Sequence, residues 1–249
     1  MNAACEQAIV LQKGETIQGQ LILLHQAEFL AQTADLCLRL TADEIQSVDG
    51  ETDLRRIAAM GRQVNCETCH FHEVHPDGGG TDWTRTVEVY QGAEPKTSQT
   101  WVFGRKTTPL SPEERRELGQ VFASMEYRDQ WGRVLSMIIE EESERGWKYS
   151  VLFDVPVLPG ESFALTEKKV WPRWGRREGE EWIRRHYIGH TSGALTTVVI
   201  RLPEGACYVQ LEPEPLWKMK LNNREIAGWR HYIGEGEALM PVVRYRLGD

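Results

Sequence analysis

Short apolar runs separated by Gly and Pro turns recur roughly every 8–12 residues from Arg133 onward, and this pattern constrains the fold more than any other feature of the sequence. Regular strand-length runs with such turns are typical of an antiparallel β-sandwich. We therefore predict a sandwich over residues 131–249. The Asn222-Asn223 pair has the composition of a two-residue hairpin turn inside it.

An internal repeat lies within this region. The segment Arg185–Gly189 (RHYIG) recurs as Arg230–Gly234, forty-five residues later. Aligned without a gap, residues 185–202 and 230–247 share eight identities in eighteen positions. Two copies are too few for a solenoid. We predict two similar hairpins within one sandwich, related by a pseudo-twofold axis. A paired functional role for His186 and His231 is the alternative.

One amphipathic helix is expected over residues 111–125. Ser111 is a suitable N-cap, Pro112 follows at the first helical position, and Glu114 completes a capping box. Apolar residues then recur at helical spacing, namely Leu118, Val121, Phe122 and Met125. This helix belongs to a predicted middle region, 61–130, that also contains a Cys/His loop and strands.

The first sixty residues also consist of short apolar runs joined by tight turns. Gly14 and Gly19 flank the start of a strand that could bend strongly, as small barrels require. We predict a small barrel of SH3-like or Sm-like shape over residues 1–60. The predicted fold class is therefore mainly β, with a small N-terminal barrel, one amphipathic helix and a C-terminal sandwich.

The charge of the chain is unevenly distributed. The formal net charge is −8, and residues 1–83 alone carry five basic and thirteen acidic side chains, so 5 − 13 = −8. The acidic part should repel nucleic acid and anionic lipid, so we expect neither a nucleic acid nor a membrane partner. No apolar run approaches the ~18 residues of a spanning helix. Because the N-terminal residues also lack a signal-peptide pattern, we expect a cytoplasmic protein.

Four metal-ligating side chains are regularly spaced in the Cys/His loop: Cys66, Cys69, His72 and His75. Thiolate and imidazole suit Zn²⁺, although four ligands within ten residues could hardly enclose a tetrahedral ion. His25, Cys37 or a second molecule could complete such a site. The alternative is a pair of buried reduced cysteines beside a solvated loop. The Cys-x-x-Cys-His pattern also fits haem attachment, but the absence of an export signal argues against haem.

A basic stretch rich in tryptophan runs from Lys168 to Arg185, with seven basic and three acidic side chains. Tryptophan and arginine dominate the hot spots of protein interfaces. The same composition could track a phosphate backbone and stack bases, or could cap the sandwich core with Arg stacked on Trp. We predict a protein-binding surface, made by Trp171, Arg173, Trp174, Arg176, Arg177 and Trp182.

Familiar catalytic motifs are missing from the sequence, including the nucleophile elbow, the phosphate loop and the His-Glu-x-x-His zinc motif. We therefore expect a non-enzymatic interaction module, an accessory or adaptor subunit of a larger assembly, that binds a protein partner. No small-molecule substrate can be assigned from the sequence. The alternative is a zinc-binding protein or a metal-dependent hydrolase that uses the Cys66–His75 cluster.

Overall fold

The computed structural model describes residues 66–105, 107–186, 188–189, 193–221, 223–234 and 237–248. A boundary separates Met1–Val64 from Asn65–Asp249, and every described residue lies in the second unit. The small barrel predicted over residues 1–60 lies outside the described residues. So do His25 and Cys37, the two further ligands suggested for the Cys/His cluster.

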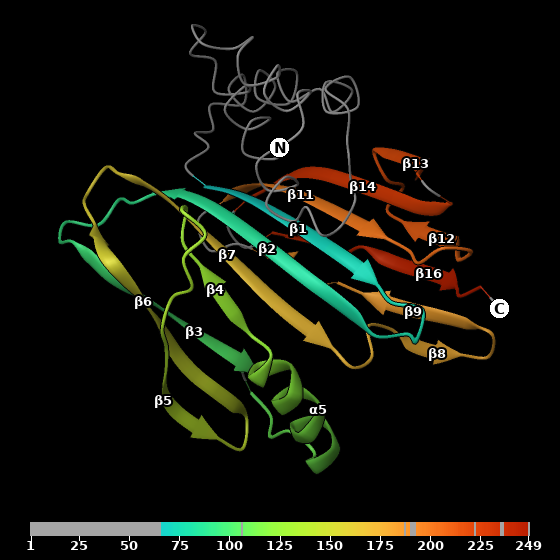
Figure 1. Cartoon of the computed structure of the whole chain (residues 1–249), viewed down its shortest axis with the longest axis horizontal. Helices are drawn as coiled ribbons and strands as arrows, with labels where there is room; N and C mark the ends of the chain where they lie inside the picture. The colour runs from blue at the N-terminus through green and yellow to red at the C-terminus, as the bar shows by residue number, and fades with distance from the viewer. Residues whose placement is uncertain are drawn as a thin grey trace, which may run out of the picture. The chain divides into compact units, whose positions relative to one another are not determined.

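The described residues form a mainly β structure, as predicted (Figure 1). The largest sheet has the order β13-β14-β11-β1-β2-β7-β4. Its strands are β1 (Cys66–Val74), β2 (Gly80–Val89), β4 (Glu126–Arg128), β7 (Ser162–Trp171), β11 (Ala194–Arg201), β13 (Trp217–Leu221) and β14 (Arg224–Ile233). A four-stranded sheet, β12-β16-β9-β8, contains β8 (Arg176–Glu178), β9 (Glu181–Arg185), β12 (Cys207–Glu212) and β16 (Val242–Arg246).

A hydrophobic core joins these two sheets. It contains residues of β11 and β14 from the seven-stranded sheet and of β16 from the four-stranded sheet. The largest buried side chains in it belong to Trp174 and Tyr245, both 0% exposed. The short strands β10 (Ile188–Gly189) and β15 (Ala238–Leu239) pair with each other and contribute Ile188 and Leu239 to the same core. Two sheets that face one another across one core make a β-sandwich.

A second hydrophobic core packs against a third sheet. The sheet β3-β6-β5 consists of β3 (Lys96–Gly104), β5 (Met137–Ser143) and β6 (Gly146–Val157). It packs through an aromatic cluster on helix α5 (Pro112–Ala123), β4 and β7. The rings of Phe122 and Trp147 stack there with centroids 5.0 Å apart.

Helix α5 confirms the amphipathic helix predicted over residues 111–125. The Ser111 hydroxyl accepts a hydrogen bond from the Glu114 backbone N–H at 3.2 Å, and the Glu114 carboxylate accepts one from the Ser111 backbone N–H at 2.9 Å. This reciprocal capping box satisfies two backbone donors that the first turn would otherwise leave unpaired. Val121 and Phe122 are the buried residues of its apolar face.

The segment Cys66–Val74 differs from the prediction, because it forms strand β1 and not a loop. β1 lies inside the seven-stranded sheet, antiparallel to β2 and parallel to β11. The sheet of this sandwich is therefore mixed, where an antiparallel one was expected. A parallel pair needs a long crossover, and the strands between Val74 and Ala194 supply it. Since β1 and β2 share a sheet with strands from 131–249, the two predicted regions interleave within one unit.

The repeat has a clear structural counterpart. We call residues 181–202 the first repeat and residues 226–247 the second repeat. In the ladder between β11 and β14, Val198 pairs with Trp229, and in the ladder between β16 and β9, Val243 pairs with Arg184. These two pairs are equivalent under the forty-five-residue offset of the repeat. Val198 of the first repeat corresponds to Val243 of the second (198 + 45 = 243), and Arg184 of the first corresponds to Trp229 of the second (184 + 45 = 229). Each repeat thus gives one strand to each sheet and pairs with the other repeat in both.

No helix among the described residues is long and apolar enough to cross a membrane.

Candidate functional site

The basic, Trp-rich stretch folds into the end of β7 and the β8–β9 hairpin, where β8 is the edge strand of the four-stranded sheet. On β9, Trp182 and Arg184 share one face of the strand. Their partners on β16 are Tyr245 and Val243, both fully buried in the sandwich core. The face that carries Arg184 is therefore the one directed at the core.

A tight glycine turn positions this hairpin. The turn joins β1 to β2, and Gly78 has a φ of +84°, a conformation that few side chains tolerate. A Cβ at Gly78 would lie 2.5 Å from the Trp182 ring, and one at Gly80 would lie 2.5 Å from the Trp174 ring. The glycine-rich segment therefore lets two indoles of the basic stretch approach the backbone closely.

Buried hydrogen bonds fix Trp174 in place. Its indole Nε1–H donates to Asp82 Oδ1 at 2.9 Å, and its backbone N–H donates to the Gly78 carbonyl at 2.9 Å. The same Asp82 oxygen accepts a hydrogen bond from His72 Nδ1 at 2.7 Å. Burial would raise the pKa of Asp82, but the contact with His72 and the charges of Arg184 and His186 together hold this pKa well below its usual range. Asp82 is thus a carboxylate whose charge is already compensated.

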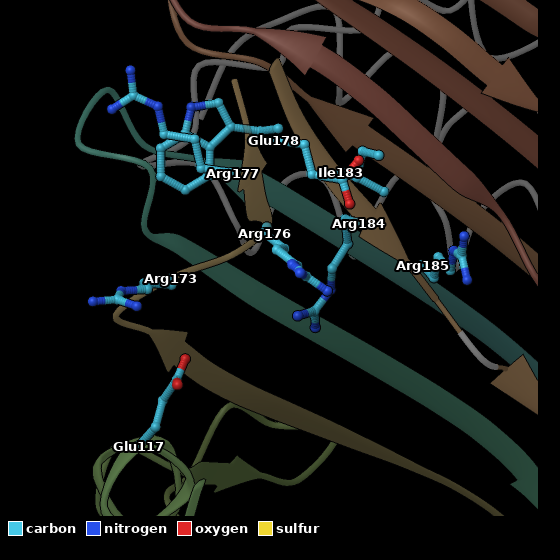
Figure 2. A pocket seen from close by; sticks show the side chains of 10 residues that line it. Glu117, Arg173, Arg176, Arg177, Glu178, Ile183, Arg184 and Arg185 are labelled. Atoms are coloured by element: carbon cyan, nitrogen blue, oxygen red, sulfur yellow. The ribbon is translucent and has the colours of Figure 1, made fainter. Parts of the chain in front are cut away.

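Next to this hairpin lies a pocket of about 870 Å³. Figure 2 shows Arg176 and Arg184 extending into the space between the hairpin and helix α5, with Glu117 of the helix on the opposite side. The lining consists of five arginines, two glutamates and three other residues: Arg173, Arg176, Arg177, Arg184, Arg185, Glu117, Glu178, Gly175, Trp182 and Ile183.

The five arginines of this pocket are not neutralised. Among the described residues, no carboxylate lies within ion-pair distance of any of them. The same sheet shows the opposite arrangement nearby, because Glu181 accepts from Arg244 at 3.1 Å and from Arg246 at 2.7 Å. Since guanidinium groups match carboxylate and phosphate oxygens in geometry, the pocket is suited to an anion.

Arg184 is the most enclosed of the five. Its guanidinium lies over the Trp171 ring at 4.5 Å and over the Trp174 ring at 5.7 Å, and its Nε is buried without a hydrogen-bond partner among the described residues. Burial lowers the pKa of Arg184, and the charge of Asp82 offsets this only in part. Burying a cation costs several kcal/mol, and stacking on the indoles offsets about 0.5–2 kcal/mol of this cost.

Two histidines lie behind Arg184. The rings of His72 and His186 have centroids 4.2 Å apart, and both are buried. Burial lowers the pKa of His186 well below its usual value, and the neighbouring His72 and Arg184 lower it further. His186 is therefore neutral at pH 7. The Nε2 atoms of both histidines lack a hydrogen-bond partner among the described residues.

The structure does not bring the four predicted zinc ligands together. Cys66 and Cys69 are three residues apart on β1, so their side chains lie on opposite faces of the sheet. His72 is bound to Asp82, and His75 contacts the Thr81 hydroxyl at 3.0 Å. Burial raises the pKa of the Cys66 thiol to about 11 and that of the Cys69 thiol to about 12. Within the described residues, no group of three or more His, Cys, Asp or Glu side chains could hold a metal ion.

The predicted partner-binding residues are placed in three different ways. Arg173, Arg176, Arg177 and Trp182 line the pocket, Trp171 lies beneath Arg184, and Trp174 is buried in the core. The prediction omitted Arg184 and Arg185, which belong to the same basic stretch. It also omitted Glu117, because no local signal connects a helix residue with a hairpin more than fifty positions later.

Neither the protein-family models nor the curated proteins include one that matches this sequence. Among solved structures, the chain is similar to an M1 zinc metallopeptidase from Deinococcus radiodurans bound to a Tyr-Ser-Ala substrate, with 10% identity and a TM-score of 0.42 over 72% of this chain and 41% of that one. It is also similar to a putative nutrient binding protein from Legionella pneumophila, with 4% identity and a TM-score of 0.48 over 74% of this chain and 68% of that one. This chain spans only about two fifths of the metallopeptidase. At these TM-scores, the similarities carry no inference about activity.

Proposed function

We propose that this protein is a non-enzymatic interaction module, an accessory or adaptor subunit that binds an acidic segment of a protein partner in its arginine-lined pocket. The observation that carries this proposal is the set of five arginines that line one pocket without carboxylate ion-pair partners among the described residues. Arginine and tryptophan at the centre of a concave surface are typical of protein interaction sites.

A protein partner is favoured over a nucleic acid by the charge of the whole chain. A net charge of −8 repels a long polyanion at a distance, whereas a short acidic segment can still be held by a local cationic pocket. The hairpin is also anchored by buried indoles, so the arginines are presented from a preformed surface.

A binding experiment with defined peptides tests this proposal. We expect a fluorescein-labelled oligoglutamate peptide to bind the full chain and to be released by salt, because exposed charge pairs are screened. The double variant Arg176→Glu/Arg177→Glu should lose this binding. Fluorescence anisotropy measures the affinity, with a neutral Gly-Ser peptide as the reference.

A matched control lies on β13, the strand that precedes the second repeat. Lys218 and Lys220 are exposed there and do not line the pocket. The variant Lys218→Glu/Lys220→Glu changes the net charge by the same amount and should still bind the peptide. Equal loss of binding in both variants would show that only the net charge matters, and it would rule out the pocket as the contact.

A further inference from the structure

We infer that the pocket selects a phosphate monoester, with Arg184 as the residue that determines this specificity and a phosphorylated segment of the protein partner as the source. This inference rests on the proposed function, because it concerns the same pocket. It adds the chemical class of the anion and the residue that recognises it.

The repeat shows that the fold does not require a charge at Arg184. The equivalent residue in the second repeat is Trp229, which occupies the same place in its ladder opposite Val198 as Arg184 occupies opposite Val243. Trp229 is buried in the sandwich core, and its Nε1–H donates to the Pro213 carbonyl at 2.7 Å. One position of the pseudo-symmetric pair is thus filled by an apolar ring, and the other by a cation that has no ion-pair partner in the described part of the chain.

Among the residues that the structure describes, no carboxylate forms an ion pair with Arg184, although the charges of Asp82 and Glu117 favour its charged form. Of these two carboxylates, Asp82 has the larger effect on Arg184, but its Oδ1 already accepts hydrogen bonds from both His72 and Trp174. Glu117 belongs to the opposite side of the pocket, on helix α5. His186 also adjoins this cluster and, being neutral, adds no negative charge. The charge of Arg184 is therefore left for a ligand.

The charge of the lining favours a dianion over a single carboxylate. Five arginines and two glutamates leave three excess positive charges, 5 − 2 = 3. A phosphate monoester carries about −1.5 to −2 charge at pH 7 and offers three acceptor oxygens, whereas a carboxylate carries one charge on two oxygens. Arg184 at the floor and Arg176 on the neighbouring strand can each donate to such oxygens from different directions.

Three peptides of one sequence test this inference, carrying phosphoserine, glutamate or serine at the central position. We expect the phosphoserine peptide to bind the full chain at least about tenfold more tightly than the glutamate peptide. The variant Arg184→Met should lose this preference and bind both peptides equally. Inorganic phosphate should raise the thermal melting temperature of the wild type but not of Arg184→Met. It should bind far more weakly than the phosphopeptide, because the source is a protein segment.

Thermal stability separates a binding role from a structural one. If Arg184 serves a ligand, Arg184→Met removes an uncompensated charge from an enclosed site and its melting temperature equals or exceeds that of the wild type. A lower melting temperature would assign Arg184 to the fold and overturn the inference. Arg184→Lys keeps the charge but loses the planar fork, so it should fold and still lose the preference for phosphate.

The outcomes separate this inference from the proposed function. Equal affinity of the wild type for the phosphoserine and glutamate peptides overturns the inference and leaves the proposed function standing. Failure of every anionic peptide to bind overturns both. Tighter binding of single-stranded oligodeoxythymidylate than of the phosphopeptide overturns both as well, in favour of a nucleic acid.

Discussion

The two repeats of this protein have the same strand register but use equivalent positions differently. In the second repeat, Trp229 and Ala227 fill the core, and the strand lies within the seven-stranded sheet. In the first repeat, the equivalent residues are Arg184 and Trp182, and the strand lies next to the edge strand β8. Both strands lie next to an edge strand, since β14 pairs with β13 and β9 pairs with β8. The comparison shows that one architecture supports a packed core or a cationic pocket according to the side chain at the equivalent position.

The largest expected difference between the repeats concerns their equivalent core positions. Trp229→Ala should lower the free energy of unfolding by about 3–5 kcal/mol, because it leaves a cavity among buried residues. Arg184→Ala should lower it by much less, since the lost stacking is offset by the removal of an enclosed charge. Urea denaturation of both variants measures the difference. Equal losses would mean that both positions serve the core alike.

The second expected difference concerns the arginines at the ends of the two repeats. Arg201 is 3% exposed and pairs with Glu73, whereas its equivalent Arg246 is exposed and pairs with Glu181. Arg201→Ala should cost about 2–3 kcal/mol, because the half-buried Glu73 carboxylate loses one of its two ion-pair partners among the described residues, Arg201 and Arg224. Arg246→Ala should leave the urea midpoint close to that of the wild type. A large shift for Arg246→Ala would contradict this assignment.

The smallest expected difference concerns the histidines of the two RHYIG segments. His186 is buried with a lowered pKa, and its equivalent His231 is exposed. Because the unfolded chain binds a proton at His186 below about pH 6.5 and the folded chain does not, this residue makes stability fall as the pH falls. His186→Phe should reduce that slope by about 1 kcal/mol per pH unit between pH 6 and 5. Urea denaturation of the wild type and of His186→Phe at each pH measures the slope.

Much of the fold can be predicted from local sequence signals. The capping box at Ser111 marks the start of helix α5, and Asn223, with a φ of +59°, lies in the turn at which Leu221 pairs with Arg224. These features involve residues close together in the chain, so the interactions that form them can be recognised from the sequence alone. The basic stretch around Arg176 is visible for the same reason.

The Cys/His segment is a part of the fold that the sequence did not predict correctly, because it forms a strand and not a loop. Strand β1 carries buried polar residues on both faces, with Glu67 and Cys69 on one and Thr68 and His72 on the other. Without alternation between polar and apolar residues, nothing in the segment indicates a strand. Its parallel partner β11 also lies more than a hundred residues later, so the pairing depends on tertiary structure alone. Once the segment is a strand, its regular Cys and His spacing separates the side chains.

The pairing of each repeat with the other in both sheets has a consequence for synthesis on the ribosome. Strand β9 acquires its β16 partner only after residues 242–246 have been made, and β11 waits likewise for β14. Until then, both strands present open hydrogen-bonding edges that invite wrong pairing. We expect nascent chains that end between Arg201 and Val242 to depend on chaperones more than the finished protein does.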